Sequence, residues 1–405
     1  MEEQKSSFRW IVLVLLFLNL FAATLSMQCM PPLFSEIAEQ IPLTKAQMGT
    51  IMGVITLASL FFAPIGGALS DKLGCRFALG IAASIVALAG ACRYFAGSVT
   101  DLIICMFILG AGMAMYGPNM PKALGTWFGR KDLAMANGIC ISGMGIGGAL
   151  VMATAKSVLS PNLGGWRGTV VVFGCFVLAV AILWMTLYKD KAAGTGTVKK
   201  QQNVFENFKK VMKVKDIWLL SLFYGCNMIS LLAVITLLPL TLEERGVENP
   251  GGLVSIMMGT TVVFNILGGI FSDKVGKRKP FLLISTIVFG VCVLGFANFT
   301  GTPLLIVLVI AGAALGTIAP VLMSVPVEME KIGTALAGTA VGFIFMLGNT
   351  GGFMGPVVAG KLMDVTGNAM PGFIFVSTVL MVAAGFIVPL KETGRKRKQG
   401  EAHRH

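Results

Sequence analysis

The sequence predicts an all-α membrane protein in which twelve transmembrane helices form two pseudo-symmetric bundles of six. Three observations support this fold class: the composition, the number of long apolar runs and an internal repeat. Hydrophobic residues make up 55% of the chain and charged residues only 13%, whereas a soluble chain usually carries about 25% charged residues. The composition therefore excludes a water-soluble fold.

Each predicted helix is an apolar run long enough to cross a bilayer, which takes roughly 17 to 25 residues. The twelve runs cover approximately residues 10–32, 46–69, 77–97, 102–124, 134–158, 168–188, 217–241, 251–271, 281–298, 303–326, 332–360 and 371–390. The first run follows Lys5 and Arg9, as a signal peptide would. No small-residue cleavage motif ends it, so we expect it to stay in the mature protein as a helix.

The positions of lysine and arginine predict the orientation. With the N-terminus inside, 26 of the 32 lysines and arginines fall in segments on the cytoplasmic side, which is the usual bias of membrane proteins. Both termini are therefore predicted to be cytoplasmic, in the plasma (inner) membrane. The net charge of +13 reflects this topology, so we expect membrane lipids and no nucleic acid as partners.

Four regions follow from the runs: a first bundle over 1–188, a cytoplasmic linker over 189–216, a second bundle over 217–390 and a basic cytoplasmic tail over 391–405. In the linker, apolar residues between Val204 and Met212 recur at helical spacing among lysines. This pattern is typical of an amphipathic helix on the inner leaflet. A solvated linker that only follows the charge bias explains it equally well.

Neither a metal site nor a cofactor is expected. The eight cysteines include no C-x-x-C pair, and cysteine in an apolar run usually acts as a small hydrophobic residue. The histidines are His403 and His405, in what reads as a solvated tail. No cluster of nucleophile, base and acid can be assembled and no P-loop is present, so we expect neither an enzyme nor an ATP-driven pump.

The two halves of the chain repeat. Gly66 to Arg76 aligns with Gly268 to Arg278 at a constant offset, so that the pattern G-x-x-x-D-K-x-G-x-R occurs twice. Each copy lies at the predicted inner end of the second helix of its half. Glycines of the fifth and eleventh runs align as well. Duplicated bundles are typical of secondary transporters.

This repeated pattern resembles the signature loop of the major facilitator superfamily. The resemblance covers the whole chain: twelve helices, a long central cytoplasmic loop and the signature in both expected loops. It implies a monomeric secondary transporter that works by alternating access. It also implies six gating residues at the inner surface, namely Gly67, Asp71, Arg76, Gly269, Asp273 and Arg278.

The roles of these gating residues can be stated physically. The two glycines have no side chain, which permits close approach of a neighbouring helix. The resemblance implies that Asp71 faces the start of the eleventh helix near Gly333, and Asp273 the start of the fifth near Ala134, where a helix N-terminus favours negative charge. The two signature arginines would hold the carboxylates, forming an inner latch. Alternatively, the charges only end the helices and set the topology.

A finer resemblance concerns the substrate. The stretch from Gly110 to Lys122, together with Arg93, is similar to anion-handling branches, most nearly the cyanate permease-like transporters and more distantly the monocarboxylate porters. Nitrate porters carry an arginine in helices 2 and 8 that this chain lacks, which disfavours nitrate. The Gly-Pro pair of drug antiporters is also absent from the fifth run, which disfavours antiport of drugs against protons.

Ionisable groups inside a membrane are costly and usually functional. No Asp, Glu or His lies near the middle of a predicted span, and Arg93 is the deepest basic residue. It either meets an anionic substrate or snorkels to the interface. In the family, helices 1, 4, 7 and 10 line the cavity, where polar side chains contact substrate or bond neighbouring helices. The candidate substrate-binding residues are Asn19, Gln28, Arg93, Tyr116, Asn119, Tyr224, Asn227 and Ser324.

The function predicted from these residues is proton-linked uptake of a small organic or inorganic anion. One alternative is efflux of amphipathic compounds through a methionine- and phenylalanine-rich cavity. Another is a sensor of transporter shape that does not transport and whose 189–216 loop binds a cytoplasmic partner.

Overall fold

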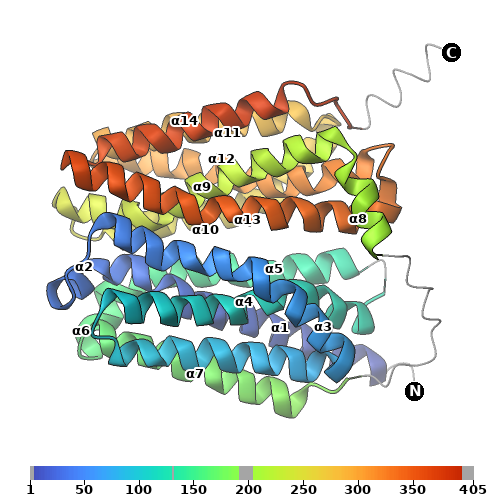
Figure 1. The fold of residues 1–405 in the computed structure, drawn as a ribbon, viewed down its shortest axis with the longest axis horizontal. Coiled ribbons are helices and arrows are strands. Elements are labelled where there is room, and N and C mark those ends of the chain that lie inside the picture. Colours follow the sequence, from blue (N-terminus) through green and yellow to red (C-terminus); the bar gives the residue numbers. More distant parts are fainter. Residues whose placement is uncertain (1–3, 130–131, 191–203, 395–405) are drawn as a thin grey trace. The chain divides into compact units, whose positions relative to one another are not determined.

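The computed structural model describes residues 4–129, 132–190 and 204–394. Within these ranges the chain is helical and contains no strand, which confirms the predicted all-α fold (Figure 1). Residues 191–203 of the predicted linker and 395–405 of the predicted tail, with both histidines, lie outside the described residues.

The described part of the chain holds eleven helices long and apolar enough to cross a membrane. One of them, α3 (Lys45–Cys92), accounts for two predicted spans because it is broken at Gly74, where φ is 83°. A side chain is strongly disfavoured in that backbone conformation, so glycine permits the break. All twelve predicted spans are therefore present.

The chain divides into two compact units. Unit 1 comprises residues 1–194 and Pro239–Ser255. Here α3 packs against both α4 and α7, and α1 packs against α5 (Figure 1). Besides α3, its elements are α1 (Gln4–Gln28), α2 (Met30–Gln40), η1 (Arg93–Phe95), α4 (Val99–Trp127), α5 (Leu133–Thr154), η2 (Ala155–Leu159), α6 (Ser160–Asn162) and α7 (Trp166–Leu187).

Unit 2 comprises residues 195–238 and 256–405. Two of its helices continue into unit 1: α9 beyond Leu238 and α10 before Ile256. Pro239 inside α9 marks the first of these boundaries, and proline there removes one helical hydrogen bond. The elements are α8 (Val204–Met212), α9 (Lys215–Glu244), α10 (Pro250–Val275), α11 (Lys279–Asn298), α12 (Gly301–Glu328), α13 (Gly333–Thr366) and α14 (Met370–Ile387).

The amphipathic helix expected in the linker is present as α8. Its Val211 is fully buried, and the ring of Phe208 packs against Phe343 of α13 with 5.4 Å between ring centroids. The apolar face of α8 therefore packs on unit 2 at these residues.

A close helix crossing recurs in the two units. In unit 1, a Cβ on Gly66 of α3 would lie 2.7 Å from the Cα of Met115 in α4. In unit 2, a Cβ on Gly268 of α10 would lie 2.8 Å from the Cα of Thr317 in α12. Both distances are too short for any side chain. These two crossings are counterparts in the repeat.

The close approach expected at Gly67 and Gly269 is not made by these residues. A Cβ on Gly67 would lie 3.7 Å from the Cβ of Pro118, and one on Gly269 would lie 3.6 Å from that of Pro320. Both are ordinary van der Waals contacts. The reason is that successive helix residues point about 100° apart. Only Gly66 and Gly268, one residue earlier, therefore face the backbone of the neighbouring helix.

Candidate functional site

At the predicted inner end of unit 1, Asp71 is paired with a lysine of the neighbouring helix. The Nζ of Lys122 lies 2.6 Å from an Asp71 carboxylate oxygen and donates to Ser70 Oγ at 3.0 Å. The Asp71 side chain is 73% exposed, so water screens the pair and it adds little stability. Asp71 can therefore change partner at low energetic cost.

The expectation that Arg76 holds Asp71 is wrong. Arg76 Nε donates to the backbone carbonyl of Met185 in α7 at 2.8 Å, and Nη2 donates to the same oxygen. Arg76 follows the break at Gly74, where the chain starts the second part of α3 beside α7. Its side chain therefore ties α3 to α7, and Lys122 holds the carboxylate instead.

In unit 2, the expected pair of Arg278 and Asp273 is present. Nη2 of Arg278 lies 2.6 Å from Asp273 Oδ1 and also 2.6 Å from an oxygen of Glu328, at the end of α12. Nη1 donates to Ser272 Oγ at 2.9 Å. The hydrogen bond to Glu328 raises the pKa of the Arg278 guanidinium, although burial acts in the opposite direction.

Two inner-end partners, Lys122 and Glu328, were missed by the sequence analysis. Each is a charged residue at the predicted inner end of its apolar run, and that position was the one available signal. The implied approaches of Asp71 to Gly333 and of Asp273 to Ala134 join different units and stay predictions. The side chain of Ala134 lies outside the described residues.

Two of the candidate substrate contacts in unit 1 meet between α1 and α4. The hydroxyl of Tyr116 donates to Asn19 Oδ1 at 3.4 Å, and both side chains are buried. One turn further along α4, Asn119 Nδ2 donates to the carbonyls of Gly66 and Met115 at 3.0 and 2.9 Å. Asn119 Oδ1 has no hydrogen-bond partner among the described residues. We call Asn19, Tyr116 and Asn119 the α1–α4 polar seam.

Arg93 lies in η1 and is fully buried against α1 and α4, so it does not snorkel to an interface. Its Nε donates to the carbonyl of Gly90 at 2.9 Å and its Nη2 to Ser26 Oγ at 3.0 Å. Its Nη1 faces the sulfurs of Cys29 and Met106, both at 3.6 Å. All four acceptors are neutral, and sulfur is a weak acceptor. Among the described residues, no carboxylate is bonded to this guanidinium.

The remaining candidates do not form one cluster. In unit 2, the ring of Tyr224 packs against Phe345 of α13 with 5.0 Å between centroids. Asn227 Nδ2 and Ser324 Oγ both donate to carbonyls of their own helices, at 2.9 and 2.8 Å. In unit 1, Gln28 is half-buried. The side-chain oxygens of Gln28 and Asn227 have no hydrogen-bond partner among the described residues.

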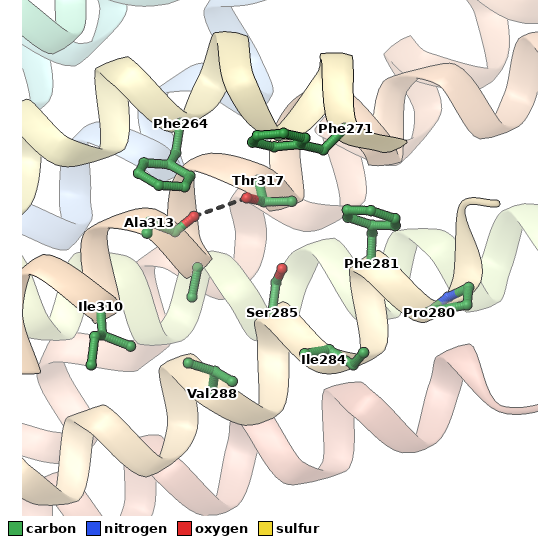
Figure 2. A pocket seen from close by; sticks show the side chains of 12 residues that line it. Phe264, Phe271, Pro280, Phe281, Ile284, Ser285, Val288, Ile310, Ala313 and Thr317 are labelled. Atoms are coloured by element: carbon green, nitrogen blue, oxygen red, sulfur yellow. Dashed lines mark hydrogen bonds between the residues drawn. The ribbon is translucent and has the colours of Figure 1, made fainter. Parts of the chain in front are cut away.

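A separate cavity of about 350 Å³ lies in unit 2 between α10, α11 and α12 (Figure 2). Its lining is apolar except for Ser285 and Thr317, and the hydroxyl of Thr317 donates to the carbonyl of Ala313 at 2.9 Å. None of its lining residues carries a positive charge. This cavity therefore lacks the chemistry of an anion site.

The fold and these sites define a polytopic helical membrane protein in which two bundles repeat the same loop and the same glycine crossing. The family model described as Major Facilitator Superfamily matches residues 16–260 and 249–405. The chain belongs to this superfamily, as the signature loops indicated.

Two relatives are named for the movement of small anions. The chain is 27% identical to the "probable sulfoacetate transporter SauU" of Cupriavidus necator over 87% of this chain and 88% of that protein. It is 26% identical to the "nitrite extrusion protein" of Bacillus subtilis over 92% of each chain. A solved bacterial homologue of the human lysosomal transporter Spinster superposes with a TM-score of 0.78 at 16% identity, covering 94% of this chain and 96% of that one. The superposition shows the fold.

Proposed function

We propose that this protein is a secondary active transporter that takes up a small organic or inorganic anion together with a proton. Duplicated bundles are typical of transporters that work by alternating access. In these transporters the substrate binds near the midplane of the membrane, between the two bundles. The two relatives named above act on a sulfonated carboxylate and on nitrite, which supports an anionic substrate.

The main support for the proposal is the environment of the buried Arg93 guanidinium. A buried cation bonded only to neutral acceptors leaves the interior of unit 1 with an uncompensated positive charge. The electrostatic energy of such a charge is high at low dielectric, and a nearby anion lowers it. Because Nη1 is bonded only to sulfur, an anion oxygen would be a stronger acceptor for this edge. Binding there requires a rearrangement that opens the α1–α3 contact.

The remaining sites have assigned roles in this proposal. The α1–α4 polar seam and Gln28 offer polar contacts in unit 1, and Tyr224, Asn227 and Ser324 do so in unit 2. Asp71 and Asp273, with their partners, form the inner latch. The coupling proton travels with the anion or is balanced by Arg93, because no carboxylate lies near the middle of a span. The protein acts as a monomer in the plasma membrane with both termini in the cytoplasm.

Uptake by intact cells that express the protein tests the proposal. Four anions form the panel: sulfoacetate, nitrite, lactate and glucuronate. We expect accumulation of at least one, rising as the outside is made more acidic and abolished by a protonophore. Accumulation of none, with export of a cationic amphipathic dye, would indicate drug efflux. Anion binding by the purified protein without flux in proteoliposomes would indicate a sensor.

A further inference from the structure

At the predicted outer end of unit 1, a lysine inside an apolar span is paired with a carboxylate from a distant part of the chain. Lys156 lies in η2, a π-helical turn within the span Met135–Asn162. Its Nζ donates to Ser35 Oγ of α2 at 2.6 Å and to a carboxylate oxygen of Glu243 in α9. π-helical turns occur frequently at functional sites. Figure 1 places α2 and α6, the helix that follows this turn, at the same end of unit 1.

The pair belongs to a set of contacts that fixes Pro239–Ser255, which we call the α9–α10 segment, on unit 1. Lys45 Nζ lies 2.8 Å from a carboxylate oxygen of Glu244. A Cβ on Gly251 would collide with the carbonyl oxygen of Met152 in α5, so the packing is tight. The segment thus belongs to unit 1 although α9 and α10 continue in unit 2. A movement that separates this segment from the rest of unit 1 breaks the Lys156–Glu243 pair.

Breaking this pair without a replacement is unfavourable. The side chains of Lys156 and Glu243 are 29% and 32% exposed, so both are largely removed from water. Separating a partly buried pair leaves a desolvated charge without a partner. Glu243 is near the end of α9 and can turn to water, whereas Lys156 lies about 9 Å inside its apolar span at 1.5 Å per residue. The lysine is the partner that needs a substitute anion.

We propose that Lys156 is the first binding site for the transported anion, which displaces Glu243 from its ammonium group. The inference rests on the proposed uptake of anions. A carboxylate, a sulfonate or nitrite presents the same kind of oxygen as Glu243, so the exchange replaces one charge-assisted hydrogen bond with another. Release of the α9–α10 segment is thereby coupled to the arrival of an anion.

The Lys45–Glu244 pair provides a matched control. Lys45 is the first residue of α3 and follows a capping box on Thr44, so it lies at the very end of its apolar span and not inside it. It also binds a carboxylate of the same segment. Loss of Lys45 removes a contact of the segment but no anion site.

The test measures initial uptake by intact cells, at varied outside concentrations, of each panel anion that the wild type accumulates. Lys156→Gln should raise KM at least about tenfold, the effect of losing one charge-assisted hydrogen bond. Lys156→Arg should stay within about threefold of the wild type, since it keeps the charge. Glu243→Gln should lower KM, because the competing carboxylate is gone. Lys45→Gln should leave KM unchanged.

Two results would overturn the inference while the proposed function stands. One is a wild-type KM in Lys156→Gln. The other is a wild-type KM in the double variant Lys156→Glu with Glu243→Lys. This variant restores an ion pair between the two positions but places a carboxylate where the anion should bind. A wild type that accumulates no panel anion removes both proposals. Thermal unfolding of each purified variant checks folding, and Lys156→Arg and Glu243→Gln carry the test if Lys156→Gln does not fold.

Discussion

Asp190 and Glu392 accept hydrogen bonds at equivalent places in the two units. Asp190 accepts from the backbone N–H of Arg76, and Glu392 accepts from that of Arg278, in both cases across 114 residues of sequence. Each carboxylate also accepts from one adjacent backbone N–H, at 3.1 and 3.3 Å. Each therefore caps the start of the helix that follows the signature loop, where free N–H groups favour a negative charge.

Replacing either carboxylate should destabilise its unit. We expect Asp190→Ala and Glu392→Ala each to lower the free energy of unfolding by about 1 kcal/mol, the usual effect of losing a helix cap. Thermal unfolding in detergent measures this, and Lys189→Ala is the control because it removes a neighbouring exposed side chain. Unchanged midpoints in both carboxylate variants would contradict the assigned capping role.

Adjacent glycines should respond differently to alanine. Gly66→Ala places a methyl group against the α4 backbone, and such overpacking typically costs about 1 to 3 kcal/mol. Gly67→Ala meets only an ordinary contact with Pro118 and should be nearly neutral. The same contrast should hold for Gly268→Ala and Gly269→Ala. Comparison of the thermal midpoints of the four variants decides, and equal losses within each pair would refute the assignment.

Asp71 should act in gating. Asp71→Asn weakens the inner latch, so we expect a shift toward states open to the cytoplasm and slower turnover, with equilibrium anion binding largely intact. Labelling of a cysteine placed in the cytoplasmic cavity reports the shift. Asp101→Asn is the control, because Asp101 lies at the start of α4, far along that helix from its predicted inner end, where its carboxylate accepts from the Ser98 N–H at 2.9 Å. Unchanged labelling together with normal transport would exclude the latch.

Features set by residues close together in the sequence could be predicted, whereas contacts between residues far apart in the sequence could not. Spans and signature loops were predicted because hydropathy and repeat patterns are local. The partner of Arg76 was not predicted, because the way the helices cross decides which basic side chain reaches the Asp71 carboxylate. Lys156 and Glu243 are 87 residues apart, and no sequence pattern joins them. Asp190 and Glu392 could have been found by extending the repeat alignment, because they share its offset.

Arg93 should be required for anion uptake. Its guanidinium is bonded to Gly90, Ser26 and two sulfur atoms and to no carboxylate among the described residues. If its charge serves the anion, Arg93→Gln should abolish uptake while the protein still folds. A structural role alone would cost stability and leave the KM of the remaining folded protein unchanged.

The variant Arg93→Lys distinguishes the effect of the positive charge from that of the guanidinium geometry. Arg93→Lys keeps the charge but cannot make the planar, multiply bonded contact of a guanidinium, so we expect poor rescue of uptake. In the wild type, uptake should rise with outside acidity, because the proton travels with the anion or is balanced by Arg93. Uptake by intact cells at several outside pH values measures both effects. Normal transport by Arg93→Gln, or a preference for neutral or cationic substrates, would remove the anion assignment and the role of Arg93 together.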